Sequence, residues 1–371
     1  MVYRVIGLMS GSALDGLDIA FAEFQEAAGK WTYTLRHASC YEYPREWVEK
    51  LHHPASLNAM DYQLLDADYG HYLGEQVNKF INEHHIQYQV QLIASHGHTS
   101  FHVPEKKMTA QLGKGAAIAA VTGINVVSDL RAMDVALGGQ GAPIVPVGER
   151  LLLQDYLFFL NIGGIANISF NDPVNYKAFD VCPANRVLNM LAQAGGKAFD
   201  DGGRIAEKGS VAEDLLNRLN DLSYYSLPYP KSLSNDFGTG TVLPLINEKN
   251  YDYGDALRTY VEHICGQVVK SVEALQSEFR LRTISRQAGQ KMLITGGGAK
   301  NEFLINRLKQ LLSRINVTVE IPSDELIDFK EAIIMGLIGV LRWREENNAL
   351  ASVTGAVRDS IGGAVWMGQE A

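Results

Sequence analysis

One pattern occurs twice in this chain: an apolar, strand-like run, a loop of small residues, and a second strand-like run. Residues 6–24 read IGLMSGSALDGLDIAFAEF, and residues 156–170 read YLFFLNIGGIANISF. A loop of Gly, Ser, Asn and Asp between two apolar runs predicts a hairpin. Because both halves start alike and mix strands with helices, we predict two α/β domains around a cleft.

The remaining elements follow from periodicity and turn residues. We expect further strands at 31–43, 90–97, 124–130, 176–183 and 291–301, and helices at 46–83, 116–123, 184–196, 255–278 and 329–346. The glycine-rich stretch 136–146 is expected to cross between the domains. Residues 1–130, completed by 345–371, would then form the first domain, and residues 131–344 the second.

Composition excludes several classes of protein. The 371 residues carry a formal net charge of −9, which disfavours binding to nucleic acid or to an anionic membrane. The three cysteines are far apart, so neither a disulfide framework nor a Cys-rich zinc pattern is indicated. No stretch resembles a signal peptide or a membrane span, and we expect a cytoplasmic protein.

Three glycine-containing loops follow apolar strands. Glycine lets a backbone approach a phosphate, serine adds hydroxyl donors, and aspartate can hold Mg²⁺ directly or through water. The candidate residues are Ser10, Gly11, Ser12, Asp15, Gly16 and Asp18 in the first loop, Asn161, Gly163, Gly164 and Asn167 in the second, and Gly296, Gly297, Gly298 and Asn301 in the third. An ordinary turn is the alternative for the first loop. Neither G-x-x-x-x-G-K-[ST] nor G-x-G-x-x-G occurs, which disfavours P-loop NTPases and Rossmann dehydrogenases.

Other polar clusters leave two readings open. The stretch SHGHTSFHVP holds His96, His98 and His102, either as a metal site or as a polar loop that binds substrate. Arg131, in SDLRAMD, would neutralise a phosphate or form a structural ion pair. Asp180 ends an apolar strand, where it would act as a general base or cap the helix that Asn185 opens.

Together these segments resemble the anhydro-N-acetylmuramic acid kinase family, which belongs to the superfamily of actin, the heat-shock chaperone ATPases and the sugar kinases. The similarity runs nearly end to end. The motifs that carry it are GLMSGSALDGLDIA, SHGHTSFHVP, GINVVSDLRAMDVALGGQGAPIVP, LNIGGIANIS, FDVCPAN, DDGGRIAEKGS, PKSLSNDFG, LITGGGAKN, KEA and VTGAVRDSIGG.

The resemblance implies a two-domain actin-like ATPase fold with ATP and sugar bound in the interdomain cleft. MSGSALDG would be the first phosphate loop, with Asp15 at Mg²⁺, NIGGIAN the second, and TGGGAKN the nucleoside loop. Asp180 aligns with the catalytic base, and Arg131 and Glu331 with active-site positions around the sugar. The same resemblance implies that four further residues bind the sugar: His96, His98, Gln140 and Asn185.

The implied reaction couples a hydrolysis to a phosphoryl transfer. Water activated by the base opens the 1,6-ether of 1,6-anhydro-N-acetylmuramate, and the 6-oxygen takes the γ-phosphoryl of ATP. The product would be N-acetylmuramate 6-phosphate, an intermediate of cell-wall recycling. The resemblance also implies a homodimer.

The sequence departs from the family pattern at three places. The usual Thr-Ser of the first loop is Ser12-Ala13, the usual DTGPGN reads DVCPAN, and Asp236 stands where a Glu is usual. Cys182 and Ala184 replace glycines and could change how closely the sugar or phosphate approaches. Two other functions are alternatives. Asp180, Arg131 and Glu331 disfavour a non-catalytic actin-like ATPase, and the missing carboxylate and the three glycine loops disfavour a metal hydrolase built on the histidines.

Overall fold

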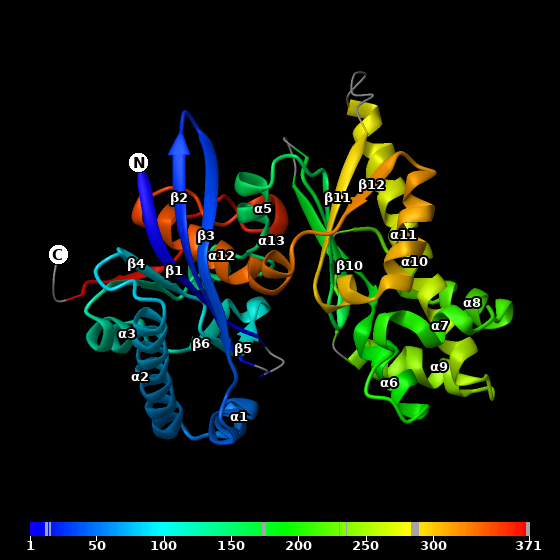
Figure 1. Ribbon diagram of the computed structural model, residues 1–371, viewed down its shortest axis with the longest axis horizontal. Coiled ribbons are helices and arrows are strands. Elements are labelled where there is room, and N and C mark those ends of the chain that lie inside the picture. The colour runs from blue at the N-terminus through cyan, green and yellow to red at the C-terminus, as the bar shows by residue number, and fades with distance from the viewer. Residues whose placement is uncertain are drawn as a thin grey trace. The chain divides into compact units, whose positions relative to one another are not determined.

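The computed structural model describes residues 1–11, 14, 16–172, 176–229, 231–234, 236–282 and 289–368. The chain divides into two compact units (Figure 1). Unit 1 comprises Met1–Gln154 and Asp328–Ala371, and unit 2 comprises Asp155–Ile327.

Unit 1 is built on a mixed sheet with the strand order β13-β7-β4-β1-β2-β3. Strands β1, β2 and β3 form an antiparallel meander, and β4 and β7 run parallel to β1. The strands are β1 (Val2–Ser10), β2 (Leu17–Ala27), β3 (Lys30–Tyr41), β4 (Leu92–Ser95), β7 (Asn125–Ser128) and β13 (Ala364–Trp366), with a separate hairpin of β5 (His98–Val103) and β6 (Met108–Leu112). The helices are α1 (Arg45–His52), α2 (Ala59–Glu83), α3 (Gly115–Thr122), α4 (Ala132–Ala136), α5 (Pro146–Leu152), α12 (Asp324–Trp343) and α13 (Ala351–Thr354), with a 3₁₀ turn, η1, at Pro54–Ser56.

Alternate residues of β1 face different helices, as the pleat of a strand requires. Ile6 and Leu8 are buried in one core with Tyr69, Leu73 and other residues of α2. Gly7 faces α12, where a Cβ would collide with the carbonyl oxygen of Ala332. The lack of a side chain at Gly7 therefore lets α12 pack directly on the central strand.

Unit 2 repeats this plan with the strand order β10-β9-β8-β11-β12. Again three strands form an antiparallel meander, while β11 runs parallel to both β8 and β12. The strands are β8 (Phe158–Ile162), β9 (Ile165–Phe170), β10 (Lys177–Pro183), β11 (Gln290–Thr295) and β12 (Val317–Glu320). The helices are α6 (Asn185–Ala194), α7 (Arg204–Lys208), α8 (Glu213–Asn220), α9 (Leu243–Asn247), α10 (Tyr253–Arg282) and α11 (Glu302–Ser313), with 3₁₀ turns η3 (Asp201–Gly203) and η6 (Gly297–Lys300).

The unit boundaries differ from the domain boundaries expected at 130/131 and 344/345. The segments 131–154 and 328–344 belong to unit 1 because they pack onto its sheet and onto each other. Lys330 on α12 forms an ion pair of 2.8 Å with Glu149 on α5, and both side chains are buried. The apolar patterning of α12 marked it as a helix but gave no sign of which sheet it covers.

Two local expectations also change. The helix expected over 46–83 is interrupted at His53 and Pro54, since proline cannot continue the hydrogen-bond ladder of α1. The histidine stretch is not a plain loop, because His98–Val103 pairs with Met108–Leu112 as a hairpin. In the described part of the chain, no helix is both long and apolar enough to cross a membrane.

Candidate active site

The first predicted loop leaves the end of β1. Ser12 and Asp15 lie outside the described residues. Gly16 is buried, and a Cβ there would lie 2.5 Å from the sulfur of Cys40 and 3.0 Å from the Tyr41 carbonyl oxygen, so glycine lets this residue pack closely against β3. Asp18 sits in β2, opposite Met9 and Cys40 in the sheet register.

Ser10 closes a buried chain of hydrogen bonds. Its hydroxyl accepts from the Tyr43 hydroxyl at 2.8 Å and lies 3.1 Å from Nδ1 of His98. His98 also hydrogen-bonds to the backbone of Leu51, so its other nitrogen carries the proton and Nδ1 accepts from Ser10. Tyr43 in turn hydrogen-bonds to Tyr69 at 2.6 Å. The structure thus gives Ser10 and His98 buried protein partners that the sequence motifs did not indicate.

His96 holds the guanidinium of Arg131. Arg131 Nε donates to Nε2 of His96 at 2.8 Å, and Nδ1 of His96 donates to the Gly97 carbonyl at 2.8 Å. This pairing fixes the neutral tautomer with the proton on Nδ1. Burial, together with the nearby Arg131 charge, lowers the pKa of His96 to about 3. Both ring nitrogens are engaged, so His96 acts on Arg131 in this structure.

A second set of contacts reaches Arg131 through the glycine-rich loop that carries Gln140. Arg131 donates to the Gly141 carbonyl, and Gly141 N donates to Asp134 at 2.7 Å. The other oxygen of Asp134 accepts from the Thr354 hydroxyl at 2.7 Å, and Gln140 N donates to the Thr354 carbonyl at 2.8 Å. The motifs around Arg131, Gln140 and Thr354 therefore form one hydrogen-bonded assembly.

Arg131 keeps its charge in this setting. Burial lowers its pKa to about 10, while the carboxylates of Glu331 and Asp134 act in the opposite direction. Glu331 lies on α12 and is partly buried. The structure thus places His96, Arg131 and the Glu331 charge in one region of unit 1.

The second loop, Gly163-Gly164, joins β8 to β9. A Cβ on Gly163 would lie 3.6 Å from its nearest neighbour, the Ile165 carbonyl oxygen, and one on Gly164 would lie 3.9 Å from Arg186. Neither glycine has the positive φ that would demand glycine. Packing therefore does not require glycine at either position, which is consistent with surface left clear for a ligand.

The third loop packs onto the second. Gly296 has φ +81°, and a Cβ there would collide with the Asn161 side chain, while one on Gly298 would collide with Ile162. Asn185 N donates to the Gly163 carbonyl at 3.0 Å, and its side-chain amide donates to the Ile162 carbonyl at 3.0 Å. The two predicted loops and Asn185 are thus brought together in unit 2, with Asn161 opposite Asn167 across the hairpin.

A cavity of about 260 Å³ lies beside these loops. Gly297, Asn185 and Asn301 line it, and Asn301 also caps α11 by accepting from Leu304 N at 3.0 Å. Sequence reasoning did not assign the other polar lining residues, Asn189, Asp200, Asp201 and Lys300. Asp200 and Asp201 open the motif DDGGRIAEKGS, which could have indicated them from the sequence.

Asp180 lies on β10 at a bulge in its pairing with β9. One carboxylate oxygen accepts from Leu233 N at 2.8 Å, and burial raises the pKa of the carboxyl group. The residue before α6, Ala184, makes no side-chain capping hydrogen bond. The helix-cap alternative for Asp180 is therefore wrong, and the segment around Leu233 holds the carboxylate instead.

Comparison with known proteins identifies the family. A family model described as "Anhydro-N-acetylmuramic acid kinase" matches residues 3–368. The chain belongs to the anhydro-N-acetylmuramic acid kinase family. The expected fold class, a two-domain α/β protein of the actin-like ATPase kind, is confirmed by this membership. The two compact units agree with it, because the strand order of the five-stranded sheet recurs in five of the six strands of the other sheet.

Relatives carrying that family's name align over nearly their whole length. The relative from Hydrogenovibrio crunogenus is 32% identical over 97% of each chain. The relative from Gloeobacter violaceus is 34% identical over 95% of this chain and 96% of its own. Among solved structures, the 2-hydroxyisocaproyl-CoA dehydratase activator from Clostridium difficile with bound ADPNP is 14% identical, with a TM-score of 0.41, over 92% of this chain and 96% of its own.

The departures within DVCPAN lie in the core, whereas Asp236 is exposed, and Ser12 and Ala13 lie outside the described residues. Val181, Cys182 and Ala184 are at most 2% exposed and belong to the apolar core of unit 2. Burial raises the pKa of the Cys182 thiol, so it stays protonated. The side chains of Cys182 and Ala184 thus point into the protein rather than toward a bound ligand.

Within the described residues, no three His, Cys, Asp or Glu side chains form a group that could hold a metal ion. A nucleotide-bound Mg²⁺ needs fewer protein ligands, because phosphate oxygens and water fill most of its octahedral shell and the protein supplies only one or two carboxylates. Asp18, directly after the first loop, supplies one such carboxylate. A single carboxylate beside the first loop is the smallest protein contribution that a nucleotide-bound Mg²⁺ needs.

Proposed function

We propose that this protein phosphorylates 1,6-anhydro-N-acetylmuramate with ATP and opens its 1,6-ether with water, giving N-acetylmuramate 6-phosphate and ADP. The observation that carries this proposal is the family match over residues 3–368, with relatives that bear the same name over their full length. The reaction would serve cell-wall recycling in the cytoplasm, where ATP is available.

Two loops are proposed to hold the phosphates of ATP, and a third the nucleoside. Gly11, Ser12, Asp15 and Gly16 belong to the first, and Asn161, Gly163, Gly164 and Asn167 to the second. The open surroundings of Gly163 and Gly164 support a phosphate contact there. The cavity lined by Gly297 and Asn301 suits the nucleoside, with Gly296 and Gly298 shaping the loop.

Mg²⁺ bound to the nucleotide would neutralise charge that develops on the phosphates during transfer. Asp15, directly or through water, and Asp18 are the proposed carboxylates for it. Ser10 supports this loop from inside the protein, through its hydrogen bonds to Tyr43 and His98.

Asp180 is the proposed general base. It would take a proton from water as the water oxygen attacks C1 and the C1–O6 bond breaks. The released O6 would attack the γ-phosphorus of ATP, and ADP would leave with the electrons of the P–O bond. The raised pKa of Asp180 brings its basicity closer to the working pH, which suits this role.

Arg131 and Glu331 are the proposed polar contacts to the sugar. His96 acts through Arg131, because its ring nitrogens are bound to Arg131 and Gly97. Gln140, whose side chain is exposed, is a direct candidate, and Asn185 shapes the second loop through the Ile162 carbonyl. We also propose a homodimer, by analogy with the family.

The decisive assay supplies ATP, Mg²⁺ and 1,6-anhydro-N-acetylmuramate and follows the sugar by mass spectrometry. We expect N-acetylmuramate 6-phosphate and one ADP for each sugar consumed. ATP hydrolysis without a sugar phosphate would support an actin-like ATPase that does not act on the sugar. N-acetylmuramate, which has no 1,6-ether, serves as the control substrate.

A further inference from the structure

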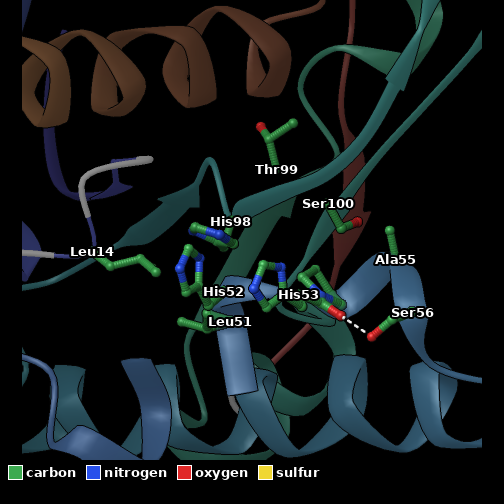
Figure 2. A pocket seen from close by; sticks show the side chains of 10 residues that line it. Leu14, Leu51, His52, His53, Ala55, Ser56, His98, Thr99 and Ser100 are labelled. Atoms are coloured by element: carbon green, nitrogen blue, oxygen red, sulfur yellow. Dashed lines mark hydrogen bonds between the residues drawn. The ribbon is translucent and has the colours of Figure 1, made fainter. Parts of the chain in front are cut away.

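A second cavity, of about 690 Å³, lies entirely within unit 1 (Figure 2). It is lined by Leu14 of the first loop, by residues 51–56 of α1 and η1, and by residues 98–100 at the start of β5. No aspartate or glutamate is among its lining residues, and three histidines are. The cavity therefore offers hydrogen-bond donors without a carboxylate to repel an anion.

The wall of this cavity is tied to the proposed site. His98 is 6% exposed and hydrogen-bonds to Ser10, the last residue of β1, and to the backbone of Leu51. His98 is thus already satisfied and connects the first loop to α1. A ligand group in the cavity would lie beside the first loop.

His52 and His53 are the free donors. Their rings stack at a centroid distance of 4.2 Å with an interplanar angle of 15°, and Figure 2 shows them alongside His98. Neither imidazole hydrogen-bonds to another described residue, and both are exposed. The Ser56 hydroxyl donates to the His53 carbonyl at 2.8 Å, which holds the turn that presents the two rings.

Small apolar groups accompany these donors. Leu14, Leu51 and Ala55 line the same cavity, and Leu51 is 1% exposed. The lining therefore suits a ligand group that combines a carboxylate with a methyl group. The D-lactyl ether of muramate is such a group, and it is what distinguishes muramate from glucosamine.

We propose that this cavity binds the lactyl group of the sugar, with the His52 and His53 imidazoles donating to its carboxylate. The proposal rests on the function proposed above, and it names the part of the chain that selects a muramate over a glucosamine sugar. Hydrogen bonds to a charged group each change binding by about 10- to 100-fold when lost.

The test compares kcat/KM for 1,6-anhydro-N-acetylmuramate with kcat/KM for 1,6-anhydro-N-acetylglucosamine, which has the same ring and 1,6-ether but no lactyl group. The parent should prefer the muramate sugar. In the double variant His52→Ala/His53→Ala the ratio should fall at least about tenfold. His52→Asn/His53→Gln keeps N–H donors and should keep part of the preference.

His71→Ala is the matched control, because His71 is an exposed histidine on α2 outside the cavity. Its ratio should equal that of the parent, and thermal unfolding of all variants checks their folding. A double alanine variant that folds and keeps the parent's ratio would overturn the lactyl assignment alone. A folded parent that phosphorylates neither sugar would overturn the proposed function, and the lactyl assignment with it.

Discussion

Thr354→Val should loosen the assembly that holds Arg131. The Thr354 hydroxyl donates to Asp134 at 2.7 Å, and the two residues are 2% and 1% exposed. Valine has nearly the same shape, so the change leaves no cavity but leaves a buried carboxylate oxygen without its donor. Hydrogen bonds to charged groups are worth about 1.5–3 kcal/mol. For a unit of this size, each kcal/mol lowers Tm by about 2–4 °C, which gives a decrease of about 3–12 °C.

The same substitution should also weaken the binding of the sugar substrate. Asp134 holds Gly141 N, and the Gly141 carbonyl accepts from Arg131. We expect KM for the anhydro-sugar to rise, while KM for ATP stays within about twofold, because the glycine loops of unit 2 are unchanged. Calorimetry and steady-state kinetics measure both effects. Thr354→Ser retains the hydroxyl and is the control; a valine variant equal to the serine variant in Tm and in sugar KM would refute the reasoning.

Four further outcomes are expected. Gly163→Val should fold, because its Cβ has room, yet lose ATP-dependent turnover; normal turnover would remove this loop from the phosphate site. Cys182→Gly should leave sugar selectivity unchanged, since Cys182 is in the core, although unfolding measurements should show lower stability. Burial raises the pKa of Asp180, so the decline of kcat/KM with decreasing pH should begin above the usual pKa range of carboxyl groups. A decline that begins only near pH 4 would contradict this. Burial lowers the pKa of His263 to about 3. The unfolded chain therefore binds a proton at a higher pH than the folded chain does, and the free energy of unfolding should decline as pH falls from about 6.5 toward 3. Denaturant titrations of His263→Gln should show a smaller decline.

The hairpins and the duplicated plan were predictable because each rests on local pattern. The alternation of β1 and the small residues of the loop at Gly163-Gly164 define strands and turns without reference to the rest of the chain. The assignment of α12 to unit 1 was not predictable, since it depends on the close approach of Gly7 to Ala332, which are distant in sequence.

Within the site, residue types were easier to predict than residue partners. The sequence predicts Asp180 and Arg131 as candidates from their places at strand ends, but their hydrogen-bond partners depend on tertiary contacts. Leu233 N donates to Asp180, and the Gly141 carbonyl accepts from Arg131. Ser10 illustrates the reverse case: its motif suggested a ligand contact, and the structure gives its hydroxyl buried protein partners. A sequence motif records that a residue type is needed and does not say whether ligand or protein needs it.

The most direct test of the proposed chemistry follows the oxygen of water. The parent enzyme is incubated with ATP, Mg²⁺ and 1,6-anhydro-N-acetylmuramate in ¹⁸O-water, and the products are analysed promptly by mass spectrometry. Unlabelled N-acetylmuramate 6-phosphate in the same water corrects for exchange at C1. With Asp180 as the base for an attacking water, the label should appear at the anomeric hydroxyl of the sugar phosphate and not in its phosphate, and Asp180→Asn should slow this labelling about 10²–10⁴-fold with ATP affinity little changed. Label in inorganic phosphate without sugar phosphate, or Asp180→Asn turnover within a few-fold of the parent, would contradict the account.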